Sequence, residues 1–239
     1  MSAFTEDHFL NRRIAVRQMA DGFRSGLDAV MLAAAVPEGE GDVLELGAGA
    51  GVASLCLAAR VSPYKVTGIE IDPALAELAN TNAHANGMDG RVRFAAADAF
   101  ALPPELKREF AHVFSNPPFH GEGMAPPNAG RHRALQDEGR LVDWLETGIR
   151  RTISGGTFTA IIRADRLGEA LAALPPTGIM VHPLWPRTGE PAKRVILQLR
   201  KGSGAPVALL PGLVLHEAGG RFTPEADAVL RDGASLALR

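Results

Sequence analysis

Short apolar runs alternate along the chain with stretches that repeat apolar positions at helical spacing. The first run, residues 43–46, ends at glycines and is followed by good helix formers over 52–60. The same order recurs, and it predicts strands at 66–71, 92–96, 111–115 and 157–163, with helices at 74–86 and 140–153. Strands that alternate with helices of this length predict an α/β fold whose parallel sheet is covered on both faces.

The flanking segments extend this pattern. Apolar runs at 179–184 and 194–199 are joined by a Pro- and Gly-rich connection, and we expect an antiparallel pair that completes the sheet. Beyond the link 203–211 we expect a strand at 213–216 and a helix at 224–230 that starts with proline. Near the N-terminus, Ser25 and Asp28 have the spacing of a capping box, which predicts a helix over 29–36.

Composition narrows the class of protein. The chain has 239 residues, 46% of them hydrophobic, one cysteine and a formal net charge of -2. This length fits one large domain or one domain with a small appendage. A single cysteine excludes an internal disulfide framework and a cysteine-based zinc site. We find no apolar run near the ~18–20 residues that span a bilayer, and the N-terminus is too charged for a signal peptide, so we expect a cytoplasmic protein without membrane contact.

The glycines after the first strand point to a nucleoside ligand. They form E-L-G-A-G-A-G, which contains Glu45, Gly47, Gly49 and Gly51. A dinucleotide-binding fingerprint would need glycine at position 52, where Val52 stands. Closely spaced glycines let the backbone approach a ligand, and the missing third glycine suits a ligand without a pyrophosphate. S-adenosylmethionine is such a ligand.

Two acidic residues end the next strands. Glu70 is placed to accept hydrogen bonds from both ribose hydroxyls of the ligand, and Asp98 is placed to accept one from the adenine amino group. The carboxyl ends of parallel strands share one edge of the sheet. We therefore expect these side chains and Glu45 to form one cofactor site there.

The fourth strand ends in Asn116-Pro117-Pro118-Phe119. Two consecutive prolines fix two φ angles and remove two backbone donors, so nearby carbonyls are held as rigid acceptors. A conjugated amine is a poor nucleophile. Hydrogen bonds from its two protons to the Asn116 side chain and the Pro117 carbonyl favour a pyramidal nitrogen that can attack. Phe119 would stack on a planar substrate.

These motifs together resemble the class I S-adenosylmethionine-dependent methyltransferases that carry (N/D)-P-P-(Y/F/W). The stretch 21–33 and the segments P-A-K-R-V-I-L-Q and R-F-T-P-E-A further resemble the bacterial valine-tRNA adenine-N6 methyltransferase family, over nearly the whole chain. The resemblance implies N6 methylation of adenosine 37 in tRNA, and a Rossmann-like fold with a seven-stranded, mostly parallel sheet and an antiparallel last strand. It also implies that S-adenosylmethionine leaves as S-adenosylhomocysteine, that no metal is needed, and that Arg24 and Ser25 help to bind the cofactor.

On this basis we expect one methyltransferase domain over 1–239. Residues 1–40 would cover the cofactor or substrate, 41–202 would form the core, and 203–239 a small extension. A sequence pI near 6.4 gives no global attraction to nucleic acid, so local cations must contact RNA phosphates. We expect this role for Arg131 and Arg133, in a Gly-, Pro- and Arg-rich segment over 120–134 that reads as a mobile loop, and for Arg187, Lys193 and Arg194.

Three other functions stay open at this point. The acceptor could be a protein glutamine, although the proteins that methylate it carry a larger helical domain before the glycine motif. The chain could be a noncatalytic RNA-binding scaffold, against which the intact acids and N-P-P-F argue. It could also methylate a small-molecule hydroxyl, for which His120, His132 and Asp137 are the candidate base or metal ligands, but they lack ligand spacing.

Overall fold

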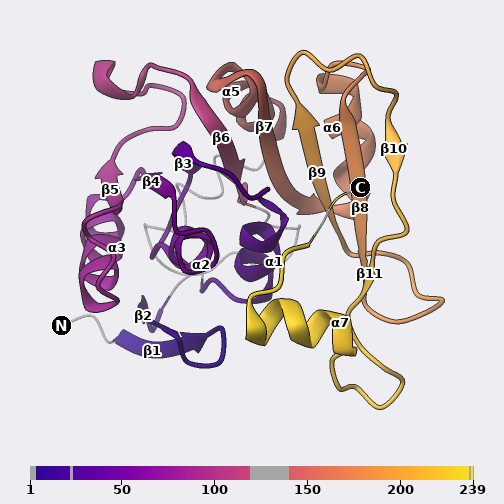
Figure 1. Ribbon diagram of the computed structural model, residues 1–239, viewed down its shortest axis with the longest axis horizontal. Coiled ribbons are helices and arrows are strands. Elements are labelled where there is room, and N and C mark those ends of the chain that lie inside the picture. The colour runs from indigo at the N-terminus through magenta and orange to yellow at the C-terminus, as the bar shows by residue number, and fades with distance from the viewer. Residues whose placement is uncertain (1–3, 22–23, 119–139, 237, 239) are drawn as a thin grey trace.

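The fold is built on one twisted central sheet (Figure 1). The computed structural model describes residues 4–21, 24–118, 140–236 and 238. The strands follow the order β10-β8-β9-β7-β6-β3-β4-β5, and β11 pairs with β8. Their bounds are β3 (Gly41–Leu46), β4 (Tyr64–Glu70), β5 (Val92–Ala96), β6 (Phe110–Ser115), β7 (Thr152–Arg163), β8 (Ile179–Trp185), β9 (Arg194–Arg200), β10 (Ala208–Leu209) and β11 (Leu213–Val214).

The strand directions confirm the predicted fold class. From β5 to β7 every neighbouring pair is parallel, whereas β9 runs antiparallel to both β7 and β8. Seven longer strands therefore make the mostly parallel sheet with one antiparallel strand that the sequence predicts. The two-residue strands β10 and β11 add to it along β8. Of these, only β11 overlaps a predicted strand.

Helices cover both faces of the sheet, as a parallel sheet requires. One apolar core lies under α1 (Leu27–Ala35), α2 (Val52–Arg60) and α3 (Pro73–Ala85). The second lies under α5 (Leu141–Arg150) and α6 (Leu167–Ala173). Short 3-10 turns, η1 (Pro104–Leu106) and η2 (Ala164–Arg166), join the elements. None of the helices in the described ranges has the length and apolar character needed to span a membrane.

An N-terminal β-hairpin, which the sequence analysis does not predict, forms a separate two-stranded sheet from β1 (Phe4–Phe9) and β2 (Ile14–Met19). Asn82 of α3 (Pro73–Ala85) and Asn86, the C-cap residue of this helix, attach it to the core. The Asn82 side chain accepts from Arg17 N at 2.9 Å and donates to Arg17 O at 3.0 Å, and Asn86 bonds both polar backbone atoms of Ala15. Asn82 also donates to Ala50 O at 3.0 Å, so the hairpin lies beside the glycine turn.

The C-terminal extension returns to the same end of the molecule (Figure 1). Its helix α7 (Pro224–Asp227) starts with a proline, and the Thr223 side chain caps it by accepting from Ala226 N at 3.2 Å. It continues into a π-helical turn, η3 (Ala228–Asp232). The predicted helix over 224–230 is therefore present, although its second half is wider than an α-helix.

The predicted capping box at the start of α1 is wrong. The N-cap is Gly26 and no side chain caps the helix. Asp28 instead accepts from Arg194 Nε at 2.9 Å, across 166 positions of sequence, and Ser25 N donates to the Gln18 side chain at 2.8 Å. Asp28 therefore forms a long-range ion pair with Arg194 instead of the local capping bond that its spacing from Ser25 predicts.

The packing of α5 against β7 gives a direct test of this core. A Cβ added at Gly148 would overlap the Phe158 ring, whereas one added at Gly168 in α6 would meet nothing within 4 Å. We expect Gly148→Ala to lower the free energy of unfolding by about 1–3 kcal/mol through overpacking. We expect Gly168→Ala to raise it by roughly 0.5–1 kcal/mol, because alanine suits a helix better. Equal effects in urea denaturation would contradict this packing.

Candidate active site

The glycine turn between β3 and α2 adopts a backbone that other residues rarely take. Gly47, Gly49 and Gly51 have φ angles of 73°, 54° and 86°. Space restricts two of these positions as well, since an added Cβ would lie 3.0 Å from the Trp144 ring at Gly47 and 2.6 Å from the Phe94 ring at Gly51. At Gly49 nothing lies within 4 Å. The turn therefore packs against aromatic rings at Gly47 and Gly51 and has free space at Gly49.

The end of β4 holds this turn in place. Gly47 N and Ala48 N both donate to Ile69 O, at 3.0 and 2.9 Å. Gly49 N donates to Glu70 Oε2 at 2.9 Å, and Glu70 Oε1 accepts from Asp72 N at 3.1 Å. Burial raises the pKa of Glu70, and these hydrogen bonds oppose part of that rise. The predicted ribose acceptor therefore also fixes the turn that would face the ligand.

Glu45 lies deeper than the other acids. Its side chain is buried on β3, and Oε2 accepts from Ser54 N at 3.2 Å and from the Ser54 hydroxyl. Burial raises its pKa to about 8, although the bonds from Ser54 oppose this shift. Glu45 thus ties the first strand to the first turn of α2, and its expected contact with the cofactor stays a prediction.

Aromatic residues stand next to the third predicted acid. Asp98 Oδ1 accepts from Phe100 N at 2.8 Å. The Phe100 ring meets Trp144 edge-to-face with centroids 5.2 Å apart, and the Arg140 guanidinium lies 3.7 Å above it. Within the described part of the chain the buried Trp144 Nε1 has no acceptor. Sequence reasoning missed this cluster, because helical periodicity marks Trp144 only as a core residue.

Asn116 follows β6, the neighbour of β3 in the sheet. The register pairs Ser115 with Leu46, and Ser115 Oγ donates to Leu46 O at 3.0 Å. The start of N-P-P-F therefore lies beside the start of the glycine turn. Asn116 Oδ1 is buried and accepts no hydrogen bond from any described residue. Pro117 is buried and Pro118 is half-buried, while Phe119 lies outside the described residues.

A buried amide oxygen without a donor carries a large desolvation penalty. A ligand with an N–H group at this place would remove that penalty. The oxygen also lies at the carboxyl edge of the sheet, where α/β folds bind their ligands. The geometry therefore suits a ligand N–H group at Asn116, beside the glycine turn.

Three of the predicted RNA contacts gather around one hollow. Arg187, Lys193 and Arg194 line a depression of about 320 Å³ between the ends of β8 and β9 and the C-terminal extension, which we name the β8–β9 hollow. Glu190 also lines it and accepts from Arg187 at 3.2 Å. The structure gives Lys193 no acidic partner among the described residues. Arg131 and Arg133 lie outside the described residues, as does the whole segment 120–134.

The remaining predicted cofactor residues lie against the hairpin. Arg24 donates to Asp7 Oδ1 at 2.5 Å, and the backbone of Ser25 makes two hydrogen bonds with the Gln18 side chain. Arg24 and Ser25 precede α1 in the sequence, and these hydrogen bonds also join them to β1 and β2. The cofactor role of Arg24 and Ser25 stays a prediction.

The buried Glu45 predicts a pH dependence of stability. Its folded pKa, about 8, exceeds the ordinary value of 4.5, so the native state binds more protons than the unfolded state between these values. The contribution of Glu45 to the free energy of unfolding is therefore complete below the ordinary pKa of 4.5 and decreases as the pH rises towards 8. We expect Glu45→Gln, which keeps an acceptor for Ser54, to flatten the fall measured by urea denaturation. An unchanged slope would contradict a protonated Glu45.

Comparisons with known proteins agree with this site. A model of the methyltransferase small domain family matches residues 26–141. The tRNA1(Val) (adenine(37)-N6)-methyltransferase of Porphyromonas gingivalis strain W83 is 31% identical over 172 residues, which are 68% of each protein. That of Yersinia enterocolitica is 27% identical over 218 residues, covering 87% of this chain and 84% of the relative.

A solved structure shows the same fold over most of the chain. A protein from Agrobacterium tumefaciens, described as a predicted O-methyltransferase, superimposes with a TM-score of 0.73 at 29% identity. The match covers 88% of this chain and 98% of that protein. These findings confirm the resemblance seen in the sequence motifs. The chain belongs to the bacterial tRNA1(Val) (adenine(37)-N6)-methyltransferase family and is a class I methyltransferase that depends on S-adenosylmethionine.

Proposed function

We propose that this enzyme methylates the exocyclic N6 amine of adenine in tRNA, at anticodon-loop position 37. The observation that carries the proposal is the buried, unpartnered Oδ1 of Asn116 at the carboxyl edge of the sheet. The names of the curated relatives supply the acceptor. A tRNA acceptor also fits the cytoplasmic location expected from the sequence.

Asn116 and Pro117 would prepare the amine for attack. The lone pair of an adenine amine is delocalised into the ring. Accepting its two protons at Asn116 Oδ1 and the Pro117 carbonyl favours a pyramidal nitrogen, and Phe119 would stack on the base. The nitrogen then forms a bond to the methyl carbon as the carbon–sulfur bond breaks. The alkylated nitrogen is acidic and loses its proton without a strong base.

The cofactor would lie across the ends of β3, β4 and β5. When bound, S-adenosylmethionine supplies an electrophilic methyl group on a sulfonium and leaves as S-adenosylhomocysteine. The open middle of the glycine turn at Gly49 would leave room for the ligand. Glu70 would bind the ribose and Asp98 the adenine amine, while Gly47, Gly51, Glu45, Arg24 and Ser25 would shape the pocket around them.

The acceptor RNA would approach along the carboxyl edge. Arg187 and Lys193 at the β8–β9 hollow are exposed and suited to phosphate contacts. Arg187 and Arg194 are partly neutralised by Glu190 and Asp28, so we assign Lys193 the largest share. Arg131 and Arg133 stay in the proposal on sequence grounds.

Transfer of labelled methyl groups tests the proposal. The enzyme would be incubated with labelled S-adenosylmethionine and total bacterial tRNA, with a protein extract and a pool of small-molecule hydroxyl acceptors run in parallel. We expect label in RNA, recovered after digestion as N6-methyladenosine. Label only in protein would assign glutamine methylation, and label only in a small molecule would assign the O-methyltransferase activity named for the Agrobacterium protein. Either result would overturn the tRNA assignment.

Substitutions at Asn116 test whether this residue acts in methyl transfer or in cofactor binding. Asn116→Ala should lower kcat by about 10²-fold or more, because it removes a preorganised acceptor, and should leave cofactor affinity nearly unchanged. Asn116→Asp keeps an oxygen acceptor and serves as the matched control, with a smaller loss expected. If Asn116→Ala weakened cofactor binding as much as it slowed turnover, its role would be structural.

Glu70 should show the opposite pattern. Removing its charge-assisted hydrogen bonds by Glu70→Ala should weaken S-adenosylmethionine binding by roughly 10- to 100-fold, measured by calorimetry, with a smaller effect on kcat at saturation. Glu77→Ala, at an exposed position on α3, is the control and should bind normally. Unchanged affinity in Glu70→Ala would remove Glu70 from the cofactor site.

A further inference from the structure

A second hollow, outside the site already described, lies where the N-terminal hairpin, α1 and the C-terminal extension meet. It measures about 380 Å³, and we name it the hairpin hollow. Its apolar surface comes from Phe9, Leu27, Phe222 and Leu230, all of them half-buried. These residues come from three segments that are far apart in the sequence, so no motif indicates the hollow.

The rim of the hairpin hollow is cationic. Arg12, Arg231 and His8 line it, and no Asp or Glu is found among its described lining residues. Within the described ranges the Arg12 guanidinium has one side-chain hydrogen-bond partner, His8, with Nη2 and Nε2 3.4 Å apart, and the same Nε2 lies 3.5 Å from Glu6 Oε1. Arg231 is paired with Asp227 at 2.6 Å, outside the hollow. An apolar floor beneath two guanidinium groups, of which Arg12 has no acidic partner among the described residues, suits a ligand with a flat apolar part and an anionic part.

The turn that carries Arg12 is strained and held from outside. Leu10, Asn11 and Arg12 have φ angles of 52°, 52° and 66°, a region that non-glycine residues rarely adopt. The C-terminal extension fixes it, since Arg13 Nη2 donates to Asp232 O at 2.6 Å and Asn11 Nδ2 donates to Asp232 Oδ1 at 3.1 Å. Backbone strain maintained in this way is typical of places that position a group for binding.

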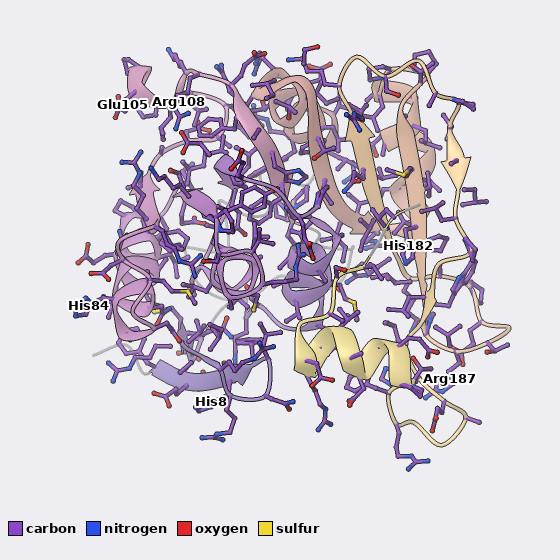
Figure 2. All side chains as sticks on the ribbon, viewed as in Figure 1. His8, His84, Glu105, Arg108, His182 and Arg187 are labelled. Carbon is purple, nitrogen blue, oxygen red and sulfur yellow. The ribbon has the colours of Figure 1, made fainter. Side chains whose placement is uncertain are left out.

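The hairpin hollow adjoins the β8–β9 hollow. The first turn of α1 borders both, because Leu27 lines the first while Asp28 pairs with Arg194, which lines the second. His216 lines the β8–β9 hollow and stacks on Phe222 of the hairpin hollow, with ring centroids 4.8 Å apart. Both hollows lie at the end of the molecule marked by His8 and Arg187, opposite Glu105 and Arg108 (Figure 2).

We propose that the hairpin hollow binds one unpaired nucleotide of the acceptor RNA, away from the methylated adenine. The base would lie on the apolar floor, and its phosphate would contact Arg12 and Arg231. Packing of bases on aromatic side chains is the usual way in which proteins hold unpaired nucleotides. The inference rests on the proposed RNA acceptor and extends the cation-lined surface of the β8–β9 hollow across the first turn of α1.

The salt dependence of tRNA binding tests this assignment without relying on catalysis. The dissociation constant would be measured over a range of salt for wild type, Arg12→Gln, Arg231→Gln and Phe222→Leu. Each lost phosphate contact should reduce the slope of log Kd against log salt by about 0.7 for a single strand, so we expect this in both arginine variants. Phe222→Leu should weaken binding several-fold at an unchanged slope.

Arg200→Gln is the matched control, because Arg200 is exposed at the opposite end of β9. Its slope should equal that of wild type. Photocrosslinking of tRNA that contains 4-thiouridine gives a second readout, and we expect crosslinks to peptides containing Phe9 or Phe222. Unchanged slopes in both arginine variants, with crosslinks elsewhere, would overturn the inference. A change in self-association of Arg12→Gln without a change in slope would overturn it too, and assign the hollow to a second copy of the chain.

Failure of the wider proposal would look different. If wild type bound tRNA with an Arg12-dependent slope but transferred no methyl group to it, the proposed reaction would fail and the nucleotide site would stand. If wild type methylated tRNA and the Arg12→Gln slope were unchanged, the reaction would stand and the nucleotide site would fail.

Discussion

The left-handed glycine turn between β3 and α2 is the constraint on which the rest of the site depends. Gly47, Gly49 and Gly51 all have positive φ, and the turn is wedged between Trp144 and Phe94. Ile69 O and the Glu70 carboxylate accept from its amides. A side chain at either end would both strain the backbone and displace an aromatic ring, so the turn and the two cores that flank the sheet stabilise one another.

The pairing of β6 with β3 also fixes the position of the N-P-P motif relative to the glycine turn. Because β6 pairs directly with β3, the bond from Ser115 Oγ to Leu46 O places Asn116 beside the glycine turn. The protein leaves Asn116 Oδ1 buried without a donor among the described residues. A polar atom in that state destabilises the free protein and favours an amine in the complex. In the proposed reaction, binding of the acceptor and activation of its nitrogen would depend on the same atom.

Most of the sheet, and the position of the glycine and N-P-P motifs at its carboxyl edge, could be predicted from the sequence, because strand periodicity and these motifs are local. The β5 strand and α2 helix match their predicted ranges. The sequence analysis does not predict the hairpin because its turn, Leu10 to Arg12, contains no glycine, adopts positive φ and is joined by hydrogen bonds to the distant Asp232. The predicted capping box is wrong for a similar reason, because Asp28 pairs with the distant Arg194. Side chains joined over more than 150 positions leave no periodic signal, and the hairpin hollow brings together residues that far apart.

We propose that Asn116 holds the exocyclic amine of an adenine for attack. The most direct measurement is a crystal structure of the enzyme with S-adenosylhomocysteine and an RNA loop that contains the acceptor adenosine. We predict the adenine N6 within hydrogen-bonding distance of Asn116 Oδ1, with the cofactor across Gly49 and Glu70. An acceptor base bound with its N6 turned away from Asn116, or a cofactor away from the glycine turn, would contradict the account.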